Sequence, residues 1–253
     1  MAQSRWLASG NRYSSDTVGR IFLDTRAGRS IRAKPMAEYI AASAILHCAD
    51  GWSYLGRAIS CLLKGDPHRV VHLAYYAELR AALSLLACEG IGVFVRRHCI
   101  INGSGTARIL PAQMQTHAAA WSYLKYWSTL RRSGDLFSSV IAPSGVPLSS
   151  WFESVGGADA VVRPKAKQWF GQWSMDLSLF AEDRDARNES SYRPDGIPGS
   201  WYISPTDALS LATGLWEACD PTSGSLFDGI DRHILRMTTE SSFTGTHGVP
   251  SHA

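Results

Sequence analysis

The stretch DARNESSYRPDG at 185–196 gathers side chains that can bind a phosphate group and donate a proton. Arg187 carries a planar guanidinium that can donate to two phosphate oxygens at once. Asn188 adds an amide. Tyr192 adds a phenol with an ordinary pKa of about 10, which accepts a proton poorly at neutral pH. Because RNA cleavage through the 2′-hydroxyl also needs a group that removes a proton, these residue types favour phosphate binding over fast catalysis.

Ion pairing offers the same residues a structural role instead. Arg187 lies four positions after Asp183 and two before Glu189, and an acidic side chain close by on a helix surface can pair with an arginine. Tyr192 would then cover the end of the core. The residue types and their spacing leave both roles open.

Helices are the elements expected to position this stretch. Apolar residues recur at helical spacing in 36–65 and, most clearly, in 68–90. Asp66 and Pro67 are typical of a helix start, and Gly90 is typical of a residue just past a helix end. The short turn between the two segments predicts an antiparallel helical hairpin.

The rest of the chain also shows helical patterns. In 111–134 we expect Met114, Ala118, Trp121 and Leu124 to face inward, and Ser204 with Asp207 predicts another helix start. No segment shows the alternation of a strand. We therefore predict an all-α fold, an irregular bundle of about five to seven helices, with further helices at 165–188, 208–219 and 225–237.

Charge and composition suggest how the chain is organised. Apolar residues make up 45% of the sequence, which excludes a disordered protein. The net charge is +3, yet the segment 1–36 is rich in arginine, as a phosphate-contacting arm or a solvated, partly mobile N-terminus would be. We predict a basic arm at 1–36, a helical domain at 37–237 with an insertion at about 102–165, and a flexible tail at 238–253.

Cysteine usage and hydropathy bear on location and cofactors. The five cysteines form no Cys-x-x-Cys pair and read as reduced core thiols. No apolar run of about 18 residues and no signal peptide is visible, so we expect a cytoplasmic protein without a membrane partner. His68 and His72 have a metal-ligand spacing but lack the third ligand of a zinc motif. We therefore expect no metal and no cofactor.

Two stretches of the chain together resemble the HEPN family. HLAYYAELRAALSLLACEGIGVF, followed by RRH, resembles the second helix of that family, in which an aromatic pair, small residues and two leucines precede a Gly and then a His. DARNESSYRPDG resembles the end of a later helix that carries an Arg and a polar residue. The resemblance covers about residues 38–220 in outline. It implies a HEPN-like helical bundle that belongs to a prokaryotic defence or toxin–antitoxin type complex.

This sequence departs from the motif of the HEPN ribonucleases. That motif is an Arg, four to six residues and then a His, often with Asn directly after the Arg. Here Arg187 and Asn188 are followed by Tyr192 at the position of the histidine, and none of the eight histidines has an Arg at the required distance before it. A guanidinium holds charge but does not exchange protons at neutral pH. The resemblance therefore implies a binding or partner module rather than a nuclease.

Three functions follow from these features, and the first is our main hypothesis. It is a non-catalytic or weakly catalytic HEPN-like component that binds a protein partner, in a larger complex or a homodimer, or RNA or DNA, or both. The second is a metal-independent endoribonuclease whose dimer-assembled site contains Arg187, Asn188 and Tyr192. The third is a helical adaptor unrelated to HEPN domains. The residues expected to bind nucleic acid or a partner are Arg26, Arg29, Arg32, Arg96, Arg97, Arg131, Arg132, Arg184 and Arg193.

Overall fold

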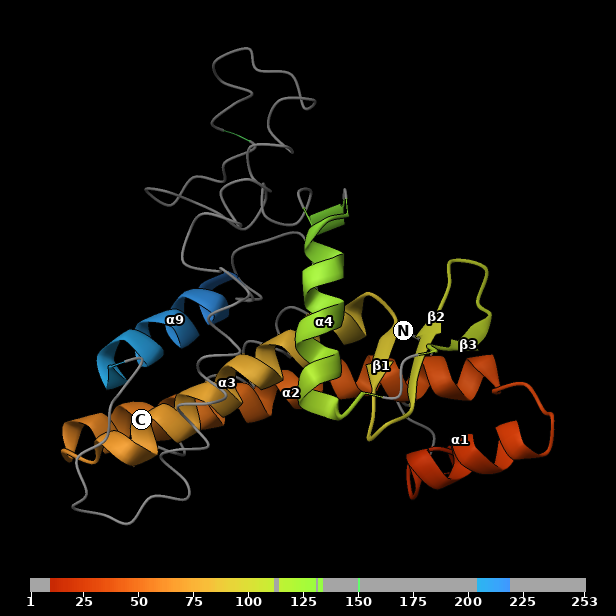
Figure 1. Ribbon diagram of the computed structural model, residues 1–253, viewed down its shortest axis with the longest axis horizontal. Helices are drawn as coiled ribbons and strands as arrows, with labels where there is room; N and C mark the ends of the chain where they lie inside the picture. The colour runs from red at the N-terminus through yellow and green to blue at the C-terminus, as the bar shows by residue number, and fades with distance from the viewer. Residues whose placement is uncertain (1–9, 112–113, 131, 134–149, 151–203, 219–253) are drawn as a thin grey trace, which may run out of the picture. The chain divides into compact units, whose positions relative to one another are not determined.

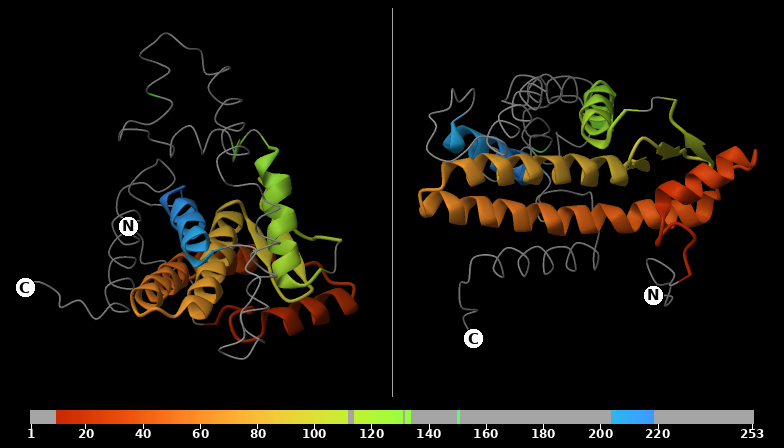
Figure 2. Two further views of the ribbon diagram at one scale, coloured as in Figure 1. Left: turned by 60° about the vertical axis from the view of Figure 1, so that its left-hand side comes forward. Right: turned by 60° about the horizontal axis from the view of Figure 1, so that its bottom comes forward.

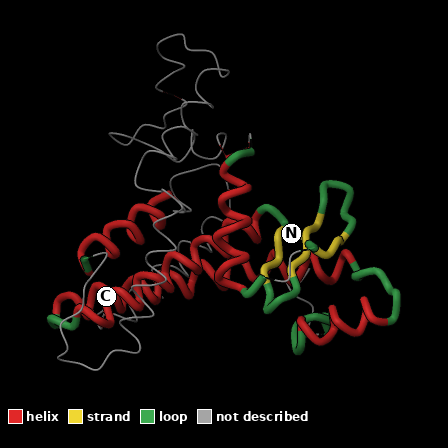
Figure 3. The backbone as a smooth tube through the Cα atoms, in the orientation of Figure 1, coloured by secondary structure: helices red, strands yellow, loops and turns green. Residues whose placement is uncertain are grey.

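The computed structural model describes residues 10–111, 114–130, 132–133, 150 and 204–218 of the chain. These residues are mostly helical (Figure 3), so the predicted all-α fold is confirmed as far as its mainly helical character. They belong to two compact units. The first comprises Met1–Cys48 and Ala82–Leu124, and the second comprises Ala49–Ala81 and Lys125–Ala253. Helices α2 (Ala33–Leu63) and α3 (Pro67–Cys88) contribute residues to both units.

The predicted hairpin of two long helices is confirmed. Helix α3 begins at Pro67, and the Asp66 carboxylate accepts a hydrogen bond from the Arg69 amide at 3.2 Å, as a helix cap does. Within each unit the segments of α2 and α3 run side by side in opposite directions (Figure 2). In the first unit the Ser84 hydroxyl donates to the Ala44 carbonyl at 2.8 Å, so a small polar group joins the two helices there.

Helix α1 (Thr17–Arg26) lies inside the segment that the sequence assigned to a basic arm. Asp16 caps it by accepting from the Gly19 amide at 2.9 Å. Ile21 and Asp24 are buried, so α1 packs one face against the rest of the first unit. The described part of the arm is thus an element of the fold, and its one helix was not predicted.

A three-stranded antiparallel sheet corrects the prediction of an all-α fold. Its strands are β1 (Ile91–Val93), β2 (His98–Ile101) and β3 (Ala107–Ile109), in the order β1-β2-β3. Strands of three or four residues are too short to show an alternating pattern, which explains why the sequence did not predict them. Residues 102–106 connect β2 and β3.

Two further helices are described. Helix α4 (Thr116–Ser128) buries Trp121 and Leu124 as predicted, but Ala118 is exposed, so the inward face is rotated from the expected one. Helix α9 (Pro205–Ala218) begins at the predicted cap, where the Asp207 amide donates to the Ser204 hydroxyl at 3.1 Å. The helices expected at 165–188 and 225–237 and the tail at 238–253 lie outside the described residues.

The core of the first unit joins the N-terminal segment, α2 and the sheet. Tyr13, Ile21, Met36, Ile40 and Cys99 belong to one cluster of buried residues, each exposed by 1% or less. Figure 1 shows α1 and the strands on either side of the N-terminal half of α2, as this cluster requires. Tyr13 and Ile21 of the N-terminal segment therefore share one apolar core with α2 and the sheet.

Helix α3 is long and apolar enough to cross a membrane by length and composition alone. However, 78% of its most apolar window is buried inside the protein, as in the core helix of a soluble protein.

Among the glycines that the structure describes, Gly90 combines a positive φ with a close backbone atom. Its φ of +76° disfavours any side chain, and a Cβ would lie 2.9 Å from the Ile101 carbonyl oxygen. We expect Gly90→Ala to lower the free energy of unfolding by about 1–3 kcal/mol. Urea denaturation measures this difference.

Gly103→Ala is the matched control, because no atom lies within 4 Å of its added Cβ. This control should stay within about 0.5 kcal/mol of the wild type. Equal stability of the two variants would contradict the argument from φ and the close carbonyl.

Candidate nucleic-acid interface

The residues predicted to form a site fall into two groups. Five lie in the described part of the first unit, namely Arg26, Arg29, Arg32, Arg96 and Arg97, and Arg132 lies in the second unit. The ribonuclease-like stretch lies outside the described residues, so its role stays a prediction. The residues outside are Arg131, Arg184, Arg187, Asn188, Tyr192 and Arg193.

An ion pair between the half-buried Arg12 and the buried Asp24 holds α1 in place. Arg12 donates to both carboxylate oxygens of Asp24, in part through an Nε contact of 3.1 Å, and the Asp24 residue is only 3% exposed. The hydrogen bond from Arg12 lowers the pKa of Asp24, although burial alone would raise it. The carboxylate is therefore ionised at neutral pH.

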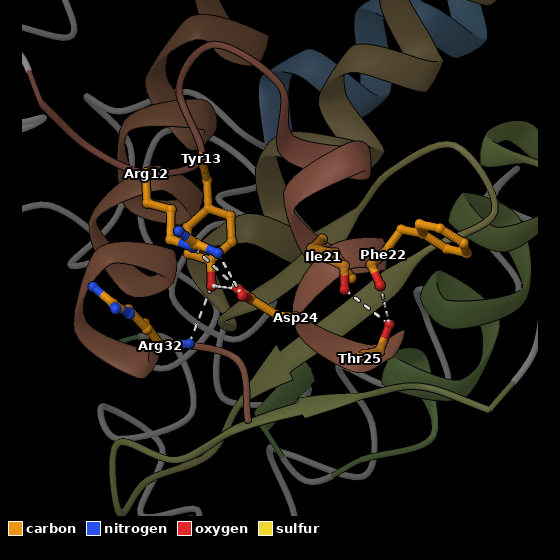
Figure 4. Close-up of polar contacts among 7 residues, drawn as sticks. All are labelled: Arg12, Tyr13, Ile21, Phe22, Asp24, Thr25 and Arg32. Carbon is orange, nitrogen blue, oxygen red and sulfur yellow. Dashed lines mark hydrogen bonds and ion pairs between the residues drawn. The ribbon is translucent and has the colours of Figure 1, made fainter. Parts of the chain in front are cut away.

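Tyr13 extends this ion pair to the chain that follows α1. Its hydroxyl donates to Asp24 at 3.3 Å and accepts from the Arg32 backbone amide at 3.1 Å. Figure 4 shows Arg12, Tyr13 and Asp24 converging on one point, with the Arg32 amide beside the phenol. The loop that carries Arg29 is consequently fixed at both ends, by α1 and by the start of α2.

The turn between β1 and β2 presents two neighbouring arginines. Arg96 is exposed and has a φ of +55°, a left-handed conformation that is uncommon outside glycine. Directly after β1, the centre of the Phe94 ring lies 5.7 Å from the centre of the Tyr39 ring of α2. The turn is thus anchored on its apolar side while its arginines lie at or near the surface.

His98 follows the same turn and forms hydrogen bonds to it and to a distant segment from the protein interior. Its Nδ1 accepts from the Phe94 amide at 3.2 Å, so Nε2 carries the hydrogen and donates to the Met114 carbonyl at 2.9 Å. The Tyr123 ring meets the imidazole edge-on with centroids 5.5 Å apart. His98 is 1% exposed, and this burial lowers its pKa.

Arg97 links the turn to α1. Its guanidinium carbon lies 5.3 Å from the centre of the Phe22 ring, within the range of a cation–π contact. Phe22 itself is 42% exposed and points away from the Asp24 ion pair (Figure 4). Helix α1 and the β1–β2 turn therefore share one surface, on which a cation and an aromatic ring meet.

The positive charge of the chain is concentrated in this unit. The described residues of the first unit contain nine Lys and Arg against four Asp and Glu, a net charge of +5, whereas the whole chain has +3. One of the four acids, Asp24, is already paired with Arg12. The exposed cations are Arg20, Arg26, Arg29, Arg32, Lys34, Arg96 and Arg108, and Arg97 is half-buried.

The second unit has a different polar arrangement. Arg80 pairs with Asp50 at 3.5 Å across the α2–α3 hairpin, and Tyr54 stacks on Tyr76 at 5.4 Å. Glu78 is fully buried. Among the described residues, no three His, Cys, Asp or Glu side chains lie close enough to hold a metal ion.

Arg12, Asp24 and His98 are important residues that the sequence did not single out. Asp24 lies three positions after the buried Ile21 on α1, so it shares the inward face of that helix. That signal becomes visible only once α1 is recognised. His98 carried no signal beyond its place in a family resemblance, because its two partners come from the turn and from a segment 16 residues away.

A comparison with protein families, with curated proteins and with solved structures finds no match for this chain. The resemblance to HEPN domains therefore rests on the residues of the chain alone.

Loss of the Asp24 charge should destabilise the first unit. In Asp24→Asn the two arginine donors face a neutral amide, and we expect the free energy of unfolding to fall by about 1.5–3 kcal/mol. Asp16→Asn is the matched control, since Asp16 is exposed and Asn caps helices about as well as Asp. If chemical denaturation gives equal losses for the two variants, the ion pair is not the anchor of α1.

His98 should make stability depend on pH. Burial lowers the pKa of His98 in the folded protein, so at mildly acid pH the unfolded chain binds more protons than the folded one. The free energy of unfolding therefore has its full value above about pH 6.5 and decreases as the pH falls toward the folded pKa. The slope is at most about 1.4 kcal/mol per pH unit. Denaturation between about pH 7.5 and 5 should show this extra slope in the wild type and not in His98→Gln. Parallel curves would contradict the assignment.

Proposed function

We propose that this chain is a non-catalytic, HEPN-like nucleic-acid-binding component of a prokaryotic defence or toxin–antitoxin type complex. The observation that carries the binding role is the set of exposed cations on the first unit, with its net charge of +5. The HEPN-like character, the complex and a protein or homodimer partner come from the resemblance alone.

Phosphate binding is the chemistry that fits these cations best. Arginines dominate the set, and a guanidinium can donate two parallel hydrogen bonds to one phosphate. Arg26, Arg29 and Arg32 follow one another on α1 and on the loop that Tyr13 holds in place. The backbone of this segment is held by hydrogen bonds while the three side chains are exposed, so several guanidinium groups can contact successive phosphates of one polyanion.

The residues of the first unit also support a non-catalytic role. The described first unit contains three histidines, His47, His98 and His117, and the one next to the arginines of the β1–β2 turn, His98, is buried with both ring nitrogens hydrogen-bonded. It is therefore unavailable to take a proton from a nucleic acid at the surface. Lysine and arginine can hold a phosphate but do not supply a general base at neutral pH.

Binding should weaken when surface cations are removed from the first unit. We expect Arg26→Ala/Arg29→Ala to lower the slope of log affinity against log salt by about 1.4–1.8, because two phosphate contacts are lost. Fluorescence anisotropy with labelled RNA and DNA at about 50 and 200 mM salt measures this slope. The control Arg57→Ala/Lys64→Ala removes the same charge from exposed residues of the second unit and should leave the slope unchanged.

Three results would contradict this proposal. One is a wild type that binds neither nucleic acid at low salt, and another is an equal effect of the two double variants. The third comes from RNA incubated with the wild type and with Arg187→Ala in EDTA. Cleavage by the wild type alone would favour the ribonuclease alternative instead.

A further inference from the structure

The surface shared by α1 and the β1–β2 turn contains an apolar element that phosphate binding does not need. Phe22 is 42% exposed, Leu23 on the same helix is 52% exposed, and Val95 in the turn is 62% exposed. The cations around them would bind phosphate equally well beside polar residues. The exposed ring therefore points to a second kind of contact on the basic surface.

We infer that Phe22 and Arg97 form a base-stacking platform that selects single-stranded nucleic acid, an inference that rests on the proposed function. Single-strand binding proteins combine a positively charged track with aromatic side chains on which bases stack. Unpaired bases also stack on the planar face of an arginine guanidinium. Both planar groups are present here, with the guanidinium carbon of Arg97 5.3 Å from the centre of the Phe22 ring.

The platform is fixed in position by contacts on the other side of α1. Ile21, next to Phe22, is 1% exposed, and Asp24 is held by Arg12 and Tyr13. Because α1 cannot rotate without breaking that ion pair, Phe22 stays on the outer face of the helix (Figure 4). Arg97 is held through its own turn, where His98 accepts from the Phe94 amide.

Cations flank the platform on both elements. Arg26 lies one helical turn after Phe22 and is exposed, and Arg96 lies next to Arg97 and is exposed. A strand that stacks a base on Phe22 or Arg97 would therefore bring its phosphates near positive charge. A duplex keeps its bases paired inside, so it can use only the cations. Selectivity for a single strand follows from this difference.

The test compares single-stranded and duplex probes. Labelled oligothymidylate and oligouridylate of about 12 nucleotides, and a duplex of the same length, are titrated with the intact protein by fluorescence anisotropy. We expect Phe22→Ala to weaken single-strand binding about five- to 150-fold, the effect of one lost base stack. Duplex binding should change less than about twofold, since phosphate contacts remain.

Matched variants separate stacking from other effects. Leu23→Ala removes an exposed apolar side chain from the same helix and should leave single-strand affinity unchanged. Phe22→Trp should keep or raise that affinity, because it retains an aromatic face. Arg97→Lys keeps the charge without the planar face, so it should weaken single-strand binding while the salt slope stays the same. Denaturation midpoints establish that each variant is folded.

The outcomes distinguish this inference from the proposed function. If the wild type binds both probes and Phe22→Ala weakens neither or weakens both equally, the stacking platform is wrong and phosphate binding stands. If the wild type binds neither probe, the proposed function fails first. Tighter binding to anionic lipid vesicles, lost equally in Phe22→Ala and Leu23→Ala, would overturn the inference and assign the surface to a membrane.

Discussion

The ion pair between Arg12 and the buried Asp24 is the interaction on which the rest of the first unit depends. A carboxylate that is 3% exposed needs a charged partner and hydrogen bonds, and Arg12 and Tyr13 provide both. Breaking this pair leaves the Asp24 carboxylate with little access to water and without its charged partner. Helix α1 is therefore tied to the protein by charge as well as by its short apolar face.

That anchor also determines where the surface groups lie. The residues before α1 supply Arg12 and Tyr13, and the residue that follows its loop, Arg32, donates its amide to the phenol. The loop between contains Arg29 and is held at both ends. Arg97 reaches the opposite side of α1 from a turn that β1 and β2 hold. Groups distant in sequence thus acquire fixed relative positions around one ten-residue helix.

The sequence predicted the parts of this fold that depend on local signals. The α2–α3 hairpin, the Asp66 cap and the Ser204 cap were predictable because periodicity and capping residues act within a few positions. Helix α1 and the strands were not, because each is short and is stabilised by contacts with distant segments. For the candidate interface, the arginines were visible as charge. Their arrangement around Phe22 was not, since it depends on the turn and on a helix that the sequence did not predict.

The uneven distribution of charge has a consequence for the behaviour of the protein in solution. Outside the described first unit, the chain carries sixteen Lys and Arg against eighteen Asp and Glu, a net charge of −2 beside the +5 of that unit. Near its isoelectric point of about 8.6 the molecule has no net charge as a whole, while the first unit stays more positive than the rest of the chain. Copies can then attract one another through opposite charges, an attraction that salt screens over roughly 10 Å at 0.1 M. Ionic strength, more than the distance of the pH from the isoelectric point, should therefore govern its colloidal stability.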